Sequence, residues 1–178
     1  SSFALAARQF ATIPGMVQFA ATLQNAAINA WNWGVSNPNI TFYNSGVVAA
    51  GENQTDDYET AMRKLSAACF LYAQTGNLTY KTYFENNYQS AHLMQWSYAY
   101  PFEAHTQDAL LYYTTLSGAT TSVKNNIHNA FSNSIKSGND DNLPAYLNQS
   151  DAYRAYLRSD NYTWGSNETK AHQANMFF

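Results

Sequence analysis

Apolar residues recur every three or four positions along most of the chain, which is the spacing of amphipathic α-helices. The spacing predicts a first helix over residues 1–13, which Pro14-Gly15 ends, and a second helix over residues 16–33. The stripe of the second helix consists of Met16, Phe19, Ala20, Leu23, Ala27, Ala30 and Trp31. From Asn37 the chain is expected to form a loop to about residue 55.

Start and stop signals define the next two helices. Asp56 followed by Glu59 has the pattern of a capping box, and Gly76 ends the helix that begins there. Asn77 is placed to cap a shorter helix that extends to Tyr88. These two helices are expected to pack as a hairpin.

A second hairpin is predicted after the aromatic segment 96–100. Pro101 is expected to open a helix that Gly118 ends, and Thr120 or Thr121 to cap the helix that follows. Weaker patterns indicate further helices at 150–158 and after residue 166.

No pair of segments alternates apolar and polar residues as strands do, so the predicted class is all-α, with about seven or eight helices in antiparallel hairpins. Hairpins of this length build either a solenoid or a closed double-layered toroid, and composition does not choose between them. Linker-like segments are lacking, so residues 1–178 are expected to be one domain or part of one.

Charge excludes several classes of partner. Charged residues make up 12% of the chain, about half the usual share, and the net charge is −3 with scattered Lys and Arg. Nucleic acid is therefore not expected as a partner, and no apolar run is long enough for a membrane span. A polar but weakly ionic surface suits an extracellular (secreted) protein that handles neutral ligands. Residues 1–5 carry no basic leader, so we expect the chain to begin inside a longer protein.

The single cysteine, Cys69, lies in an apolar run and is predicted to be a core residue.

Asparagines in Asn-x-Ser/Thr sequons are possible glycosylation sites if the producing cell is eukaryotic, and two of them, Asn77 and Asn167, are also predicted as helix caps. The six are Asn39, Asn53, Asn77, Asn148, Asn161 and Asn167.

Near the end of the chain, Tyr162 and Trp164 directly precede a helix start at which Gly165 frees the backbone and Ser166 or Asn167 can cap. A turn of this kind points flat rings outward. The segment resembles the Tyr-x-Trp-Gly-Ser-Asn-Ser stretch of glycoside hydrolase family nine, the cellulase family.

Three further landmarks occur in the order of that family. Ala27, Ala30, Trp31 and Trp33 followed by Asn37-Pro38-Asn39 resemble its Ala-rich helix that ends in Ala-Trp-x-Trp before Asn-Pro. Gly51-Glu52 resembles its Gly-Glu-Tyr loop. Its Ala-Ala-x-x-Leu-Tyr-x-x-Thr-Gly-Asp is matched by Ala67-Ala68, Leu71-Tyr72 and Thr75-Gly76-Asn77.

The resemblance implies a twelve-helix (α/α)6 toroid that acts as an inverting endo-β-1,4-glucanase with an aromatic-lined cleft. The chain would be the central segment of that catalytic domain, an incomplete toroid. The family's catalytic base lies in an upstream Asp-Ala-Gly-Asp motif and its acid is a downstream Glu, and neither motif occurs here. We assign no catalytic residue and expect the chain alone to be inactive, since Asp56-Asp57 and Asp140-Asp141 read as a helix cap and a solvated turn.

The predicted substrate-binding residues are aromatic platforms for sugar rings, with two polar neighbours. The resemblance places Trp164 in the cleft and Glu103 at a position that is often acidic, whereas Glu168 stands where some members have a substrate-contacting Arg. The set is Trp164, Tyr162, Trp96, Tyr98, Tyr100, Glu103 and Asn167.

No cofactor or metal site is predicted. The four histidines share no ligand spacing. The family's calcium-binding Asp-Glu pair is replaced by Met62-Arg63-Lys64, although Glu52, Asp56 and Asp57 could supply oxygen ligands in another arrangement.

Two function classes remain open at this stage. The chain is either part of a secreted polysaccharide-degrading enzyme or a non-catalytic helical-hairpin protein that binds carbohydrate or another protein. The expected partners are a β-glucan or related polysaccharide and the remainder of the catalytic domain or another copy of the chain. Apolar side chains at both ends of an open half-ring should then be exposed, namely Phe3, Phe10, Ile13, Met176, Phe177 and Phe178.

Overall fold

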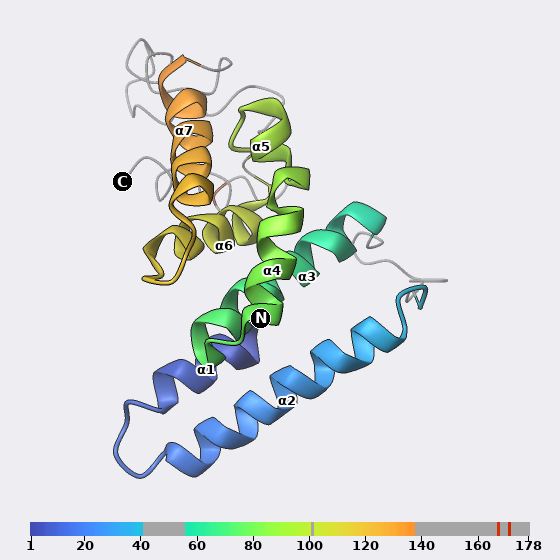
Figure 1. The fold of residues 1–178 in the computed structure, drawn as a ribbon, viewed down its shortest axis with the longest axis vertical. Coiled ribbons are helices and arrows are strands. Elements are labelled where there is room, and N and C mark those ends of the chain that lie inside the picture. Colours follow the sequence, from blue (N-terminus) through green and yellow to red (C-terminus); the bar gives the residue numbers. More distant parts are fainter. Residues whose placement is uncertain (41–55, 101, 138–166, 168–170, 172–178) are drawn as a thin grey trace. The chain divides into compact units, whose positions relative to one another are not determined.

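The computed structural model describes residues 1–40, 56–100, 102–137, 167 and 171. Within them the chain forms seven α-helices and one 3-10 helix and no strand (Figure 1). The helices are α1 (Ser2–Phe10), α2 (Val17–Ser36), α3 (Asp57–Thr75), α4 (Leu78–Asn87), η1 (Tyr88–Ser90), α5 (His92–Trp96), α6 (Ala104–Thr115) and α7 (Thr121–Ser137). The predicted all-α class is confirmed, and the helices are consistent with part of an (α/α)6 toroid. The chain divides into two compact units, Ser1–Asn87 and Tyr88–Phe178.

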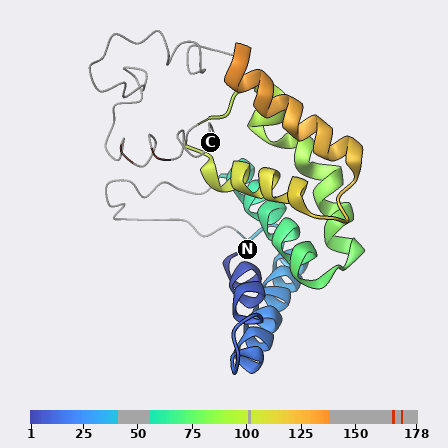
Figure 2. The same ribbon diagram turned by 90° about the vertical axis from the view of Figure 1, so that its left-hand side faces the viewer.

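In the first unit, α1 and α2 form a hairpin and lie side by side in both ribbon views (Figures 1 and 2). Gly15 adopts a φ of 81° in the turn between them, a conformation that glycine reaches without steric cost. The buried residues of the two helices are all alanines, Ala4, Ala7, Ala20 and Ala27. Small side chains let the two backbones approach closely, so this hairpin has little bulky core of its own.

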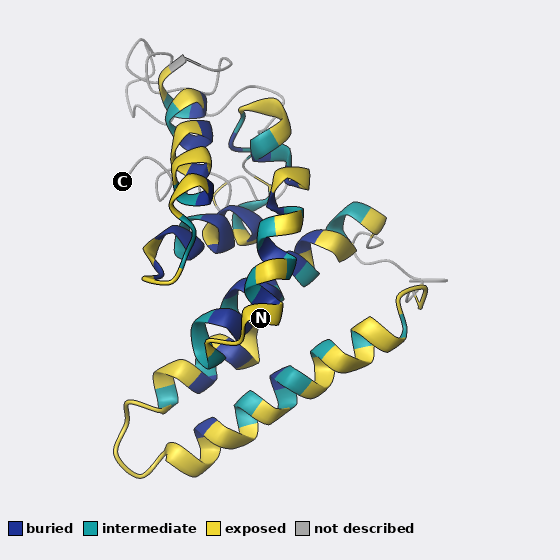
Figure 3. Cartoon of the chain, in the orientation of Figure 1, coloured by how far each residue is buried: buried dark blue, intermediate teal, exposed yellow. Residues whose placement is uncertain are grey.

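The apolar stripe of α2 is only partly buried, and most of this helix is coloured exposed or intermediate in Figure 3. Of the predicted stripe, only Ala20 and Ala27 are buried, whereas Phe19 is 46% exposed. At the N-terminal flank Phe3 and Ile13 are exposed as expected, whereas Phe10 is half-buried and packs edge-to-face on Phe19 at 5.0 Å. Residues 176–178 of the other flank lie outside the described residues.

The helix α3 begins and ends where its local signals predict. Oδ1 of Asp56 accepts a hydrogen bond of 2.7 Å from the backbone N–H of Glu59, and Gly76 takes the left-handed conformation at the C-terminus. The predicted cap of α4 is also present, because Oδ1 of Asn77 accepts from the N–H of Thr79 at 2.9 Å. The buried side chains of α3 and α4 form the core of this unit, with Met62, Leu65, Ala68, Cys69, Leu71, Tyr72, Tyr80 and Phe84.

The second unit differs from the prediction at its start. The segment before residue 101 contains two short helices, η1 and α5, that periodicity did not indicate. The helix expected to open at Pro101 begins only at Ala104, because Glu103 has non-helical dihedral angles and Phe102 lies in a turn. Pro101 itself lies outside the described residues. Helices α6 and α7 pack on each other as predicted, with Leu110, Tyr113, Ile127 and Phe131 buried. None of the described helices is long and apolar enough to cross a membrane.

Candidate functional site

Four aromatic rings gather at the end of α5 and just after it, and we call residues 96–102 the aromatic loop; Trp96 and Phe102 are exposed and Tyr98 and Tyr100 are half-buried. Trp96 and Tyr100 meet edge-to-face with ring centroids 6.3 Å apart. Tyr100 also contacts Tyr98 at 6.0 Å and Phe102 at 5.3 Å. Trp96, Tyr98 and Tyr100, three of the predicted sugar platforms, are therefore brought together by the fold.

Trp96 is supported from one side by His92. The imidazole stacks on the indole with ring centroids 3.5 Å apart and an angle of 11° between the planes. Trp96 is nevertheless 50% exposed. His92 covers one face of the indole and Tyr100 meets the ring edge-to-face, so about half of the Trp96 surface stays open to a ligand beside these two rings.

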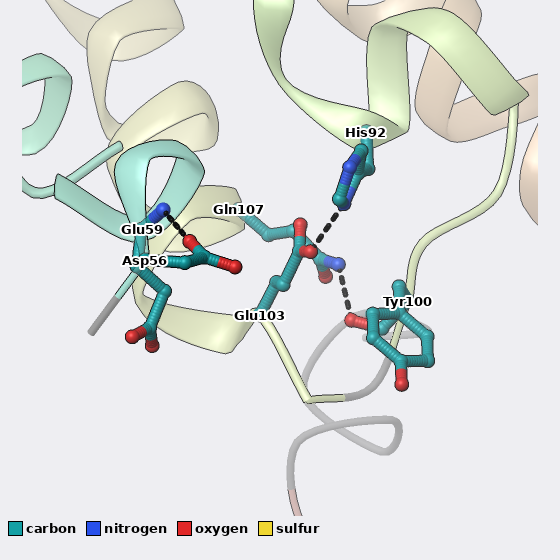
Figure 4. A network of polar contacts seen from close by, with 6 residues as sticks. All are labelled: Asp56, Glu59, His92, Tyr100, Glu103 and Gln107. Carbon is teal, nitrogen blue, oxygen red and sulfur yellow. Dashed lines mark hydrogen bonds and ion pairs between the residues drawn. The ribbon is translucent and has the colours of Figure 1, made fainter. Parts of the chain in front are cut away.

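The same imidazole also holds a carboxylate. Nδ1 of His92 lies 2.5 Å from Oε1 of Glu103 (Figure 4). An ionised carboxylate only accepts hydrogen bonds, so the Nδ1–H of the imidazole is the donor in that state. The His92 and Glu103 side chains are 23% and 13% exposed, so this contact is shielded from most of the solvent.

Glu103 is available for this contact because its side chain does not cap α6. The backbone carbonyl of Glu103 accepts from the N–H groups of Thr106 and Gln107 at the start of the helix, while the side chain makes no capping bond. Its predicted contact with substrate stays a prediction. The structure adds that the carboxylate is oriented by His92.

Two side chains from the following helices fix the backbone of the aromatic loop. From α6, Nε2 of Gln107 donates to the carbonyl oxygen of Tyr100 at 2.6 Å (Figure 4). From α7, Oγ of Ser134 accepts from the backbone N–H of Ala99 at 2.7 Å in a buried position. Ser97 turns the chain out of α5 with a φ of 51°, a left-handed conformation that is uncommon outside glycine. The rings thus stand on a backbone that is positioned by contacts distant in sequence.

The other predicted binding residues cannot be placed in this cluster. Tyr162 and Trp164 lie outside the described residues. Asn167 is helical and exposed. Their roles in substrate binding therefore stay predictions.

His92 is the residue of this site that the sequence analysis missed. The four histidines were judged by metal-ligand spacing, and His92 has none. A usable signal was its position four residues before Trp96, which puts both rings on one face of a helix.

The sequons are partly placed. Asn39 is exposed in a turn after α2, and Asn77 is exposed with its side-chain oxygen bound to the N–H of Thr79. Glycosylation joins the side-chain nitrogen, so this capping bond does not occupy the reacting atom. Asn53, Asn148 and Asn161 lie outside the described residues, and glycosylation at all six positions stays a prediction.

The residues suggested as alternative calcium ligands are only partly placed by the structure. Asp56 uses its Oδ1 as the cap of α3, and Glu52 lies outside the described residues. Among the residues with assigned positions, no three His, Cys, Asp or Glu side chains gather closely enough to hold a metal ion.

Cys69 is fully buried, and burial raises the pKa of its thiol to about 12.

Comparison with protein families adds the deciding observation. The model of the family described as Glycosyl hydrolase family 9 matches residues 1–178. The chain belongs to glycosyl hydrolase family 9. This membership supports a glycoside hydrolase, and the family implies a polysaccharide substrate. The chain matches no curated protein and no solved structure.

Proposed function

We propose that this family 9 chain forms part of the substrate cleft of a secreted, inverting endo-β-1,4-glucanase, and that its aromatic loop binds a β-glucan. The observation that carries the proposal is the state of Trp96, whose ring is half-exposed but fixed by the His92 stack. A platform that is already ordered loses little conformational entropy when a ligand binds.

The chemistry of the loop suits a neutral sugar polymer. Each pyranose ring of a β-glucan presents C–H groups on its faces, and these pack on the flat surface of an indole or phenol. Hydroxyl groups at the ring edge are donors for a carboxylate such as that of Glu103, and bonds to an ionised acceptor are stronger than neutral ones.

The catalytic step is proposed to depend on residues other than these 178. Inverting hydrolysis needs two carboxyl groups about 6.5 to 9.5 Å apart, one protonated and one holding water. Asp56 is engaged as a helix cap and Glu103 is held by His92, so we assign neither of these two carboxylates as a catalytic acid or base. The Asp-Ala-Gly-Asp motif of the family resemblance does not occur in the sequence.

A first experiment tests catalysis. The purified 178-residue chain is incubated with carboxymethylcellulose and the release of reducing ends is followed. We expect no release above the rate without protein. Turnover that disappears in Glu103→Gln would instead give Glu103 a catalytic role.

A second experiment tests binding. Cellohexaose is titrated into the chain by calorimetry, and Trp96→Ala is expected to weaken binding by roughly 1 to 3 kcal/mol, by analogy with stacking of bases on aromatic side chains. Trp33→Ala is the matched control, because Trp33 is 57% exposed on α2 in the other unit. Equal losses in both variants would contradict a specific role for Trp96. The same titration of Trp164→Ala tests the second predicted platform.

The exposed apolar surface of the α1–α2 hairpin supports a further part of the proposal. Phe3, Val17 and Phe19 are 53%, 64% and 46% exposed, and surfaces of this kind usually mark an interface. We expect the remainder of the catalytic domain to cover them. Light scattering of the 178-residue chain distinguishes this from self-association, because a concentration-dependent dimer that Val17→Asp abolishes would identify a second copy as the partner.

Secretion is proposed from the low charge and the sequons together. If the protein is exported by a eukaryotic cell, exposed Asn39 and Asn77 should carry glycans. Mass spectrometry before and after enzymatic deglycosylation measures the glycans. If the asparagines of the exported protein are unmodified, the sequons no longer support secretion.

A further inference from the structure

The first unit contains a pocket of about 660 Å³ that is lined by α2, α3 and α4. It belongs to the unit Ser1–Asn87, whereas the aromatic loop belongs to the unit that follows. The site consists of one aromatic wall, one lysine and a set of neutral polar side chains. Each of these three components restricts the kind of ligand that the pocket can accept.

The aromatic wall is built from three rings in mutual contact. Trp31 meets Tyr80 edge-to-face at 5.3 Å and Tyr83 at 5.1 Å, with interplanar angles of 87° in both pairs. Tyr80 is buried, and Trp31 and Tyr83 are half-buried and line the pocket. Two perpendicular contacts restrict the rotation of the indole, which presents an apolar surface to a ligand.

Lys64 supplies the positive charge of the pocket. Its Nζ lies 5.6 Å from the ring centroid of Trp31 and 4.9 Å from that of Tyr83. It forms no ion pair with any carboxylate that the structure describes. Burial raises the pKa of Tyr83, so its phenol is neutral at physiological pH and does not act as a counterion. The rings hold the ammonium group in place but leave its charge without an anionic partner among these residues.

The remaining lining side chains carry hydroxyl and amide groups and no negative charge. They are Ser36, Thr79, Thr82, Asn32, Asn86 and Asn87, with Val35 as an additional apolar member. Hydroxyls and amides both donate and accept hydrogen bonds, which matches a ligand with several hydroxyl groups. A single lysine balances one negative charge, so a carboxylate fits the pocket better than a phosphate dianion.

We propose that this pocket binds a uronic acid unit, a sugar whose carboxylate pairs with Lys64 while its ring lies against Trp31. The neutral polar side chains bind the sugar hydroxyls. This assigns the chain an acidic-sugar site in addition to the neutral glucan site proposed for the aromatic loop. It does not depend on the glucan proposal, because the residues are different and lie in different units.

The test is a titration of the 178-residue chain with glucuronate at low salt, followed through the indole N–H resonance of Trp31. Glucose and glucose 6-phosphate are the comparison ligands. We expect glucuronate to shift this resonance saturably and to bind at least about tenfold more tightly than glucose, since a charge-assisted bond is worth more than that factor. Glucose binding as tightly as glucuronate would overturn the proposal, and so would tighter binding of the phosphate.

Substitutions of Lys64 test whether its positive charge binds the carboxylate of glucuronate. Lys64→Gln should weaken glucuronate by about tenfold or more, whereas Lys64→Arg keeps the charge and should retain most of the affinity. Lys81→Gln is the matched control, because Lys81 is on α4 and already pairs with Glu85 at 3.8 Å. Thermal unfolding of each variant shows whether the fold is intact. Unchanged affinity in folded Lys64→Gln would refute the assignment.

A final comparison separates the two sites. Trp96→Ala should leave glucuronate binding unchanged, and Lys64→Gln should leave cellohexaose binding unchanged. Loss of glucuronate binding in Trp96→Ala would contradict an independent acidic-sugar site. If both variants bind cellohexaose as tightly as the unchanged chain does, only the glucan proposal is contradicted.

Discussion

His92 and Trp96 lie face to face, with ring centroids 3.5 Å apart and planes 11° from parallel. They are one helical turn apart in α5, a helix of only five residues. A helix this short is not stable by itself, because the cost of nucleation is recovered only over several turns. The stack and the bond from His92 to Glu103 are therefore contacts that hold α5 in its helical form.

This relationship makes His92 a positioning residue whose loss should be repaired by another flat ring. We expect His92→Ala to weaken cellohexaose binding by roughly 1 kcal/mol, because Trp96 loses its support and must be ordered by the ligand. His92→Phe should restore much of this affinity, since a phenyl ring can stack where the imidazole does. Calorimetry measures both, and exposed His105→Ala is the control. Failure of His92→Phe to improve on His92→Ala would show that the bond to Glu103, rather than the stack, is what matters.

Ser134 should be important for stability because its hydroxyl is the acceptor for a buried backbone N–H. In Ser134→Ala the N–H of Ala99 loses that 2.7 Å bond, and an unpaired buried donor costs about 1 to 3 kcal/mol of unfolding free energy. Denaturant unfolding of the whole chain measures the change. Ser122→Ala at an exposed position of the same helix should change stability by less than about 0.5 kcal/mol. Equal effects of the two substitutions would contradict the anchoring role of Ser134.

Cys69 gives the chain a defined response to alkaline pH. Burial raises the pKa of its thiol from 9.0 to about 12, so between these values the unfolded chain loses the proton while the folded chain keeps it. The contribution of this group to stability is therefore complete below pH 9 and is lost as pH rises toward 12. Cys69→Ala should unfold with a weaker dependence on pH over this range. In the native protein the thiol should react with a disulfide reagent only as fast as the unit opens, and immediate labelling at pH 8 would contradict its burial.

Asp56 is expected to stabilise α3 through its capping bond. Asp56→Ala should lower the unfolding free energy by about 0.5 to 2 kcal/mol, whereas Asp56→Asn keeps an accepting oxygen and should cost less. Asp57→Ala is the control, because Asp57 is in the first turn but makes no cap, and its interaction with the helix dipole is worth about 0.3 to 1 kcal/mol. Thermal unfolding that ranks Asp57→Ala as the more damaging change would contradict the assignment.

Much of the fold was predictable because its signals are local. Asp56, Glu59 and Gly76 determine both ends of α3 through contacts within three or four residues of each helix end, and Asn77 does the same for the start of α4. Such contacts form whenever the segment is helical, whatever the remainder of the chain does. The order of landmarks, from Trp31 and Trp33 to Tyr162 and Trp164, was likewise sufficient to indicate the family that the comparison then showed.

Other features depended on contacts that no local pattern encodes. Periodicity predicted α2 but not that only Ala20 and Ala27 of its stripe are buried, because a period of 3.6 residues identifies a face and not what covers it. The aromatic loop was predicted to present rings, yet the position of those rings depends on Glu103, Gln107 and Ser134. Ser134 binds the N–H of Ala99 although the two residues are 35 positions apart. Lys64 and Trp31 are 33 positions apart in the sequence, so no local pattern predicted their contact either. The sequence alone determined the long helices and the family, but not the short helices η1 and α5, because capping and periodicity act over one or two turns. The tertiary structure decided which side chains are fixed, exposed or paired, since those properties depend on residues that meet only when the helices pack.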